Sequence, residues 1–337
     1  MKAVGFQASL PIADPSALLD IELPRPQAAG RDLLVRIAAV SVNPIDTKMR
    51  VRGAPPEGEF RVLGWDAAGV VEEVGPDCTL FRPGDAVFYA GALPRPGTNA
   101  EYHLVDERVV GRKPTSLTYA QAAAMPLTSI TAWEALFDRL QVREPVPGAA
   151  SAIVIIGSAG GVGSMAIQLA KLVGGLTVIA TASRPETRDW VSDLGADHVI
   201  DHRQPIAAQV AELGIGAPSF VFSTTHSDQH FDDIAELIAP QGRFALIDDP
   251  EPIDVRKLKR KSVSLHWELM FTRSLFGTPD IIEQHRLLCE VARLVDEGLL
   301  RSTVAEHFGT INSDNLRRAH ALLESGAARG KIVLEGF

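Results

Sequence analysis

The chain has 337 residues, 46% of them hydrophobic and 22% charged, so it is long enough for about two domains and apolar enough to fill their cores. Its 33 basic and 42 acidic side chains give a net charge of −9, and no basic run is present, which argues against a nucleic-acid partner. The two cysteines, Cys78 and Cys289, exclude a disulfide scaffold and a site built from several thiolates.

The N-terminal residues, MKAVGFQASL, contain no apolar targeting segment, and no stretch of the chain approaches the ~20 apolar residues that span a bilayer. We therefore expect a cytoplasmic protein that does not act in a membrane.

The first part of the chain alternates short β-branched runs with turn residues. The runs at 33–42, 69–75 and 86–91 are bounded by Gly, Pro and Asp, and this pattern predicts a compact, mostly antiparallel β domain.

From about residue 150 the pattern changes to buried strands that alternate with amphipathic helices. The predicted strands are at 151–157, 176–181, 198–201, 219–224 and 243–248. This alternation predicts an α/β fold with a doubly wound parallel sheet. A helix at 314–326 and a last strand from 331 end the chain.

A glycine-rich turn, GSAGGVG, follows the first of these strands and opens a helix. Ser158 stands where the usual G-x-G-x-x-G pattern has its first glycine, while the later glycines are kept. Such a turn brings backbone N–H groups close to a pyrophosphate at the start of a helix. We predict a dinucleotide site that includes Ser158, Gly160, Gly161 and Val162.

The second strand of this part ends in Ser183 and Arg184, where NAD-preferring proteins carry an acidic residue for the ribose 2′-hydroxyl. A hydroxyl and a guanidinium would instead bind a 2′-phosphate, which favours NADPH over NADH. The alternative is structural: Ser183 and Glu186 form an S-x-x-E capping box, with Pro185 at the first helical position. His202, after the third strand, and Thr224, after the fourth, are further predicted cofactor contacts.

Six segments in order give the whole chain a resemblance to a known family. The segments are VNPIDTK (42–48), GWDAAGVVEEVG (64–75), PGDAV (83–87), PLTSITAWEAL (126–136), the GSAGGVG turn and GKIVL (330–334). Together they resemble the medium-chain dehydrogenase/reductase superfamily, and within it the quinone oxidoreductase branch of zinc-type alcohol dehydrogenase-like proteins that lack zinc ligands.

The resemblance implies a GroES-like β-rich catalytic domain at residues 1–125 and 275–337, and a Rossmann domain at 126–274, with NADPH between them. It also implies a homodimer. In the family, the segment of Thr128 and Thr131 abuts the nicotinamide, and the pair Gly330 and Lys331 contacts the cofactor.

The resemblance also locates the positions where zinc-using relatives bind their catalytic metal. The matching residues are Asn43, Trp65 and Leu127, and none of these is a credible zinc ligand. His226 and His230 have the i, i+4 spacing of a ligand pair, but a third ligand is missing from the sequence pattern. We expect no metal.

Without a Lewis acid, an acceptor that delocalises its own negative charge is the easier substrate. We therefore expect hydride transfer to quinones or α,β-unsaturated carbonyls, which agrees with the resemblance. The predicted catalytic residues are Asn43, Asp46 and Thr131, and a local turn is the alternative role for the Asn-Pro-x-Asp segment. Alternative functions are an NAD(P)-linked alcohol dehydrogenase, an enoyl-type reductase, or an NADPH-binding protein without catalysis.

Overall fold

The computed structural model describes all residues from 1 to 337, and they form two compact units. The first unit contains Met1–Ile130 and Phe271–Phe337, and the second contains Thr131–Met270. The sequence-based boundaries, at 125/126 and 274/275, lie within five residues of these. No helix is long and apolar enough to cross a membrane.

The first unit contains two β-sheets and five α-helices that lie wholly within it. Its strands are β1 (Lys2–Phe6), β2 (Leu19–Glu22), β3 (Asp32–Val42), β4 (Arg61–Val62), β5 (Asp66–Val74), β6 (Ala86–Ala90), β7 (Tyr102–Asp106), β8 (Val110–Arg112), β15 (Val304–His307) and β16 (Lys331–Glu335). Its helices are α1 (Pro44–Arg52), α2 (Tyr119–Ala123), α8 (Thr272–Phe276), α9 (Glu283–Asp296) and α10 (Ser313–Glu324). Helix α3 (Pro126–Trp133) contains the boundary between the units.

Strand β3 is the centre of the larger sheet in this unit. The order of that sheet is β15-β16-β3-β5-β6-β8, with β7 also paired to β3. Most side chains of β3 are buried, on both faces of the sheet, so exposed and buried residues do not alternate regularly along the strand. This burial explains why its sequence is a long apolar run. The C-terminal strand β16 pairs antiparallel with β3, and Ile332 faces Val42.

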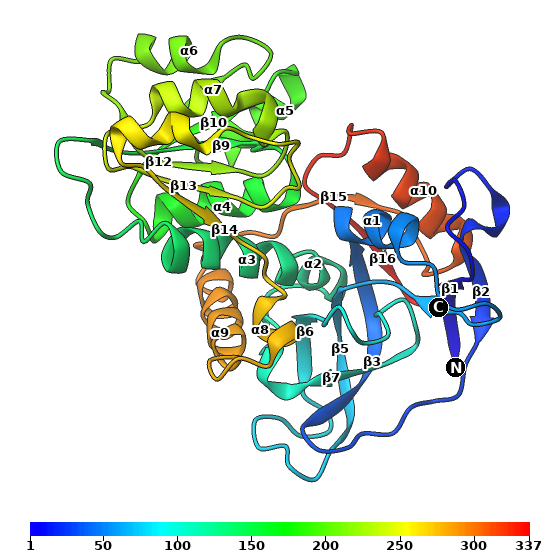
Figure 1. The fold of residues 1–337 in the computed structure, drawn as a ribbon. Coiled ribbons are helices and arrows are strands. Elements are labelled where there is room, and N and C mark those ends of the chain that lie inside the picture. The colour runs from blue at the N-terminus through cyan, green and yellow to red at the C-terminus, as the bar shows by residue number, and fades with distance from the viewer. The chain divides into compact units, whose positions relative to one another are not determined.

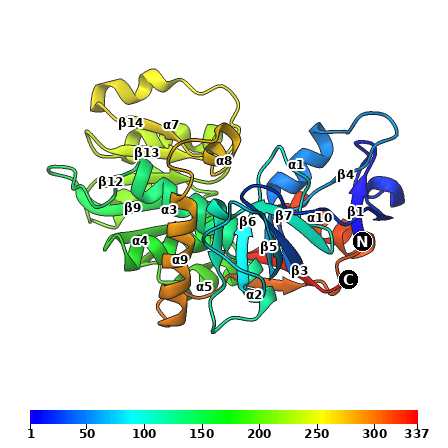
Figure 2. The same cartoon turned by 90° about the horizontal axis from the view of Figure 1, so that it is seen from below.

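Helices α1 and α10 come from opposite ends of the chain but lie side by side in both views of the first unit (Figures 1 and 2). An ion pair of 2.5 Å joins Arg50 Nη2 to Glu324 Oε1 between them, and the Arg50 side chain is buried. The C-terminal tail therefore belongs to the same unit as the N-terminal part of the chain.

The second unit is built on a parallel sheet in the order β11-β10-β9-β12-β13-β14. Its strands are β9 (Ala150–Ile156), β10 (Thr177–Thr181), β11 (His198–Ile200), β12 (Pro218–Ser223), β13 (Arg243–Leu246) and β14 (Ser264–Trp267). Its helices are α4 (Gly161–Leu172), α5 (Pro185–Asp193), α6 (Ile206–Glu212) and α7 (Ser227–Leu237), together with a π-helix at Glu134–Arg139 and a 3₁₀-helix at Val255–Lys261.

Helices lie on both faces of this sheet, with α6 and α7 together on one of them (Figure 1). The strands are apolar on both sides because both sides are covered, and β9, β12 and β13 contribute Val154, Val221 and Phe244 to one buried cluster. The strand order reverses between β9 and β12, and in folds of this kind ligands bind at the carboxyl ends of the strands beside that point.

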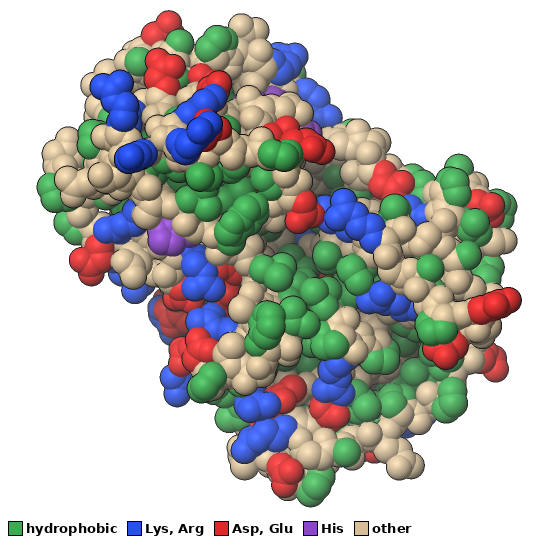
Figure 3. Space-filling model, in the orientation of Figure 1, with side chains coloured by type: hydrophobic (Ala, Val, Ile, Leu, Met, Phe, Trp, Pro, Cys, Tyr) green, Lys and Arg blue, Asp and Glu red, His purple; other side chains and the backbone are tan.

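Charged side chains of both signs are interspersed on the face shown in Figure 3, and no large patch of one sign is visible there. Trp267, at the end of the edge strand β14, is 56% exposed, whereas Met270 and Phe271 are buried.

Candidate active site and cofactor site

The glycine-rich turn lies between β9 and α4, at the carboxyl edge of the parallel sheet. Gly157 has φ +76°, and a Cβ atom there would lie 2.3 Å from Thr224 Oγ1. A Cβ on Gly163 would lie 2.5 Å from the Cα atom of Ser158. Gly157 needs glycine because side chains rarely adopt its positive φ, and Gly163 needs it because the atoms that a Cβ would meet there belong to the backbone, which cannot move aside cheaply.

Gly160 has more room, since a Cβ there would meet nothing closer than Gly157 O at 3.4 Å. It is the N-cap of α4 and provides no side-chain cap, so the N–H groups of the first turn, from Gly161 and Val162 onward, have no capping side chain. These N–H groups and the helix dipole suit a pyrophosphate. The structure thus places three predicted contacts together.

The Ser158 side chain, a predicted cofactor contact, makes its hydrogen bonds within the protein. Its hydroxyl donates to Ile155 O at 2.5 Å and accepts from Thr181 N at 2.9 Å, and the residue is fully buried. The side chain therefore joins the turn to β10. Thr224 Oγ1 is also used locally, because it donates to Ile156 O at 2.9 Å.

Ser183 and Arg184 lie between β10 and α5, as the sequence predicts, but the helix is not capped by Ser183. The N-cap is Arg184, whose N–H donates to Thr187 Oγ1 at 3.2 Å, and Pro185 follows at the first helical position. Glu186 pairs with Arg184 Nε at 3.2 Å rather than closing a capping box. The Ser183 hydroxyl makes no hydrogen bond inside the protein, so it is available to a ligand.

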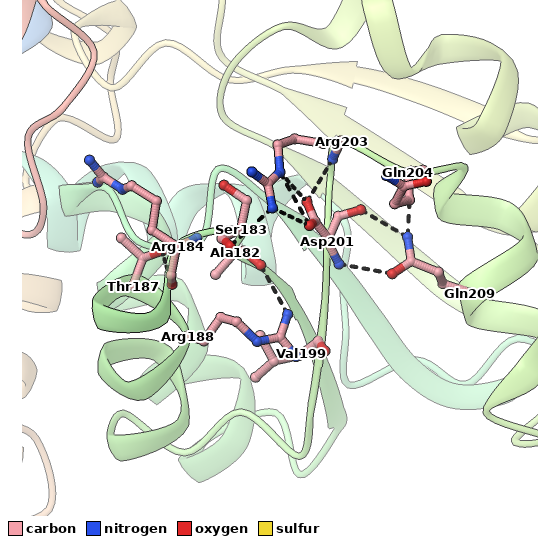
Figure 4. A network of polar contacts seen from close by, with 10 residues as sticks. All are labelled: Ala182, Ser183, Arg184, Thr187, Arg188, Val199, Asp201, Arg203, Gln204 and Gln209. Carbon is pink, nitrogen blue, oxygen red and sulfur yellow. Dashed lines mark hydrogen bonds and ion pairs between the residues drawn. The ribbon is translucent and has the colours of Figure 1, made fainter.

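Arg203, which the sequence analysis missed, lies on the other side of Ser183 (Figure 4). Its guanidinium forms an ion pair with the Asp201 carboxylate, with Nη2 2.7 Å from Oδ2, and also donates a hydrogen bond to the Ser183 carbonyl at 3.3 Å. This hydrogen-bonded pair lowers the pKa of Asp201 to about 2. Ser183, Arg184 and Arg203 thus come from the two loops that follow β10 and β11 (Figure 4), and a hydroxyl with two guanidinium groups is a set that suits a dianionic phosphate. The signal in the sequence was the triplet Asp-His-Arg directly after β11.

A second group of predicted residues meets inside the first unit. Strand pairing brings Lys331, the first residue of β16, beside the end of β3, and Asp66, the first residue of β5, faces Ser41 of β3. Asn43 follows β3 directly and is the N-cap of α1. Three neighbouring strands thus bring Asn43, Asp66 and Lys331 to one buried point.

The Lys331 ammonium has three oxygen acceptors there: Val42 O at 2.8 Å, Asn43 Oδ1 at 2.5 Å and Asp66 Oδ2 at 3.0 Å. An ammonium has three hydrogens to donate, so this set occupies all of them. The structure therefore revises the predicted role of Lys331, because a contact with a cofactor phosphate would cost it one of these bonds. Gly330, beside it, has φ +52°.

Asn43 uses both ends of its amide inside the same network. Its Oδ1 accepts from Lys331, and its Nδ2 donates to Asp66 Oδ2 at 2.8 Å and to Ser41 O at a longer 3.4 Å. Asp66 Oδ1 accepts from Leu127 N at 2.8 Å, which fixes the start of α3. A direct bond from Asn43 to a substrate carbonyl would have to replace one of these contacts.

Asp46 lies in the first turn of α1 and is fully buried. Its Oδ2 accepts from Asn43 N at 2.8 Å, and its Oδ1 has no hydrogen-bond partner. Burial, only partly offset by the Asn43 N–H and the Lys331 charge, raises the pKa of Asp46 to about 7. This carboxyl group therefore holds a proton close to neutral pH.

The residues at the zinc-ligand positions do not fit a zinc ion. Asn43 is engaged with Lys331 and Asp66, and the Trp65 ring packs edge-on against Phe271, with the ring centroids 6.3 Å apart. The apolar side chain of Leu127 has no atom that could bind a metal. No three His, Cys, Asp or Glu side chains are grouped so that they could hold a metal ion. A buried ammonium stands beside the Asp66 carboxylate instead.

Thr128 and Thr131 lie one turn apart on α3, and both are buried. Thr128 Oγ1 donates to Met125 O at 3.0 Å. Thr131 is the first residue of the second unit, so the three predicted catalytic residues come from both units. Their predicted contacts with cofactor and substrate stay predictions.

Comparison with known proteins places these features in context. Residues 29–127 match the family model "Alcohol dehydrogenase GroES-like domain" and residues 161–286 match "Zinc-binding dehydrogenase". The chain is 40% identical over 339 aligned positions to a zinc-type alcohol dehydrogenase-like protein of Staphylococcus aureus, with 99% of each chain covered.

Solved structures resemble the whole chain. A protein from Rhizobium etli named "putative zinc-dependent alcohol dehydrogenase" is 65% identical, with TM-score 0.98 over 100% of this chain and 98% of that one. A mycobacterial protein in complex with NADPH is 27% identical, with TM-score 0.82 and full coverage of both chains. A quinone oxidoreductase from Coxiella burnetii is 29% identical, with TM-score 0.79 over 100% and 99% of the two chains.

Proposed function

The chain belongs to the medium-chain dehydrogenase/reductase superfamily, among the zinc-type alcohol dehydrogenase-like proteins, and we propose that it is an NADPH-dependent oxidoreductase that reduces quinones or α,β-unsaturated carbonyls without zinc. The observation that carries this proposal is the buried network of Asn43, Asp66 and Lys331, because it occupies Asn43, one of the three positions that the resemblance matches to the zinc ligands of relatives. Membership of the superfamily makes the protein an NAD(P)-binding oxidoreductase; the zinc-free chemistry and the substrate class are our inference.

The second unit supplies the residues that would hold the cofactor. The N–H groups at the start of α4 would bind the pyrophosphate, and Ser183, Arg184 and Arg203 would bind the 2′-phosphate. The NADPH complex of the mycobacterial relative supports this choice. When bound, NADPH supplies the hydride, and the protein holds the acceptor in place while excluding water.

The acceptor class follows from the residues at the zinc-ligand positions, Asn43, Trp65 and Leu127, which do not suit a Lewis-acidic zinc ion. A simple ketone becomes an alkoxide on hydride transfer and needs strong charge stabilisation. A quinone or an enone places the charge on a phenolate or enolate oxygen, which hydrogen bonds can stabilise. The relative named a quinone oxidoreductase supports the same class.

Asp46 is the residue that we propose as the proton donor. Reduction of a quinone to a hydroquinone needs one hydride and one proton, and a carboxyl group with a pKa of about 7 can give a proton near neutral pH. Asn43 would act as a positioning residue, since its backbone N–H holds Asp46 and its amide holds Asp66 and Lys331. Thr128 and Thr131 remain proposed contacts of the nicotinamide.

The experiment that tests this function is a panel of acceptors measured by NADPH oxidation. 1,4-Benzoquinone, a linear enone and an aliphatic ketone are compared at equal concentration, each with a blank that lacks protein. We expect the quinone or the enone to exceed the ketone by at least tenfold in kcat/KM. Turnover of the ketone alone would favour the NAD(P)-linked alcohol dehydrogenase, which the name of the Rhizobium etli relative supports.

Two further outcomes would each identify a different function. Activity with an enoyl thioester but with no quinone would identify an enoyl-type reductase. Tight NADPH binding without oxidation by any acceptor would identify a non-catalytic binding protein.

We also propose that the protein forms a homodimer. Apolar side chains are exposed on and near the edge strand β14 and on α8, namely Trp267, Leu269, Leu275 and Phe276. Sedimentation of the purified protein tests this proposal, and a single species with the mass of one chain would contradict it.

A further inference from the structure

Three histidines gather at the carboxyl edge of the parallel sheet, beside the predicted 2′-phosphate site. His202 follows β11, and His226 and His230 belong to the start of α7, which follows β12. The rings of His202 and His230 meet edge to face, with their centroids 6.5 Å apart and their planes at 74°. His226 is the N-cap of α7, and its Nδ1 lies 2.8 Å from Thr225 Oγ1.

The groups around His202 are mostly cationic, and the one carboxylate among them is already paired with an arginine. Arg184, Arg203 and His226 all act electrostatically on His202, and the opposing charge is Asp201. The carboxylate of Asp201 is already held by Arg203, with Nη2 2.7 Å from Oδ2.

His230 faces His202 and His226 and the carboxylates of Asp228 and Asp233. Asp233 Oδ1 accepts from Ala207 N at 3.0 Å, so its charge is partly used there. Among the anions around the two rings, Asp228 alone makes no hydrogen bond within the protein.

Both rings are therefore harder to protonate than an ordinary histidine side chain. Burial first, and then the neighbouring cations, lower the pKa of His202, and burial followed by His202 lowers the pKa of His230. A dianion brought to the same place would reverse the balance, because it would stabilise the protonated imidazole.

We propose that His202 and His230 form a proton-accepting part of the 2′-phosphate site, so that binding of NADPH takes up a proton from solution. This inference rests on the proposed preference for NADPH. In the step, a neutral imidazole and a solvent proton give an imidazolium that pairs with the phosphate dianion. No covalent bond to the ligand forms or breaks.

A phosphate explains the cluster better than a metal ion does. Arg184 and Arg203 stand beside His202 and would repel a cation, and the three imidazoles do not form a group that could hold a metal. The same arginines attract a phosphate. When protonated, the histidines would therefore add positive charge to a phosphate site that already contains the two arginines.

The test measures the number of protons taken up when two nucleotides bind to the whole protein. Calorimetric titrations are run at about pH 7.5 in two buffers that differ in ionisation heat, once with 2′,5′-ADP and once with 5′-AMP. A free phosphate has a second pKa of about 6, so at this pH it releases little proton when it binds as the dianion. We expect 2′,5′-ADP to take up roughly 0.5 to 1 proton more than 5′-AMP.

Linkage then fixes the direction of the pH effect. If binding takes up one proton, the affinity for 2′,5′-ADP rises up to about tenfold for each unit by which pH falls between 8 and 7. The affinity for 5′-AMP stays nearly constant over that range. His202→Gln and His230→Gln should each remove at least half of the extra proton uptake.

His266→Gln is the matched control. The pKa of His266 is also lowered by burial, but His266 lies on β14, at the edge of the sheet opposite to β11. This variant should keep the full proton uptake.

Three results would overturn the inference. If 2′,5′-ADP binds more tightly than 5′-AMP without extra uptake, the NADPH preference stands and the histidine role is wrong. If the His202→Gln and His230→Gln variants keep the full uptake, another group takes the proton. If 2′,5′-ADP binds no more tightly than 5′-AMP, both the inference and the NADPH preference fail.

Discussion

The Nζ atom of Lys331 lies 3.0 Å from Oδ2 of Asp66, although 265 positions separate the two residues in the chain. Both side chains are buried, at 3% and 0% exposure. A buried charge is tolerated when its partner and its hydrogen bonds are in place, and here Asn43 bonds to both members of the pair. The pair therefore ties the C-terminal strand to the start of β5.

Removal of one member of this pair should be costly. We expect Lys331→Met to lower the free energy of unfolding by about 3–5 kcal/mol, because the Asp66 carboxylate stays buried without its counter-charge. The double variant Lys331→Met/Asp66→Asn should recover part of that loss. Urea denaturation of the three proteins measures both effects, and a single variant as stable as the wild type would contradict the account.

The buried Asp46 carboxyl gives stability a defined pH dependence. Its pKa in the folded protein, about 7, lies above the ordinary value of 3.8, so the folded state binds the proton more tightly than the unfolded state. Its contribution is therefore complete below about pH 4 and is lost as pH rises through 7. Relative to Asp46→Asn, the wild type should lose up to about 3 kcal/mol of unfolding free energy between pH 5 and 8.

Urea denaturation of both proteins across this range provides the measurement. The comparison with the variant is needed because burial also raises the pKa of Glu268, to about 9, and that carboxyl group adds a trend of the same sign to both proteins. A difference between the two proteins that does not change with pH would show that Asp46 is ionised throughout.

Two glycines of the phosphate turn should respond differently to alanine. Gly160→Ala should change the melting temperature little, because Gly160 has φ −72° and the nearest atom to a Cβ there is 3.4 Å away. The new methyl group would instead obstruct a pyrophosphate, so we expect NADPH affinity to fall at least tenfold. Gly163→Ala should lower the melting temperature as well, since its Cβ would lie 2.5 Å from backbone.

Thermal unfolding and NADPH titration of the two glycine variants separate these effects. Equal melting temperatures and unchanged affinity in both variants would show that the turn neither packs tightly nor binds phosphate.

The arginines beside Ser183 should set the cofactor preference. Arg184→Ala and Arg203→Ala should each reduce the ratio of NADPH to NADH in kcat/KM by roughly tenfold or more, since each removes a charge-assisted bond worth about 1.5–3 kcal/mol. Arg256→Ala is a matched control, because Arg256 also forms an ion pair with an aspartate two residues before it, with Nε 2.7 Å from Asp254 Oδ1. This variant should leave the ratio of NADPH to NADH in kcat/KM unchanged. Steady-state kinetics with both cofactors test this prediction. An unchanged ratio in both variants would contradict the proposed preference for NADPH over NADH.

Much of the fold could be predicted because it depends on local patterns. Strand runs that are apolar on both faces, such as 151–157, indicate a covered parallel sheet, and the glycines at 160, 161 and 163 mark the turn that follows. The family model for the GroES-like domain agrees with the predicted β-rich first part.

The partners of individual side chains were less accessible. Nothing local shows that Lys331 points into the first unit, since its partners Asn43 and Asp66 become neighbours only through the register of β16, β3 and β5. Arg203 was missed for a similar reason. The triplet Asp-His-Arg marks its place after β11, but its contact with the Ser183 carbonyl depends on how the loops after β10 and β11 fold against each other, which the triplet does not show.

The most direct test of the central claim is the rate of NADPH oxidation by 1,4-benzoquinone before and after exhaustive treatment with a chelator, with the zinc content of the same sample measured. We predict less than about 0.1 zinc per chain and an unchanged rate after treatment, because no residue set for zinc is present. About one zinc per chain, together with a rate that falls on chelation and returns when zinc is added, would contradict the account.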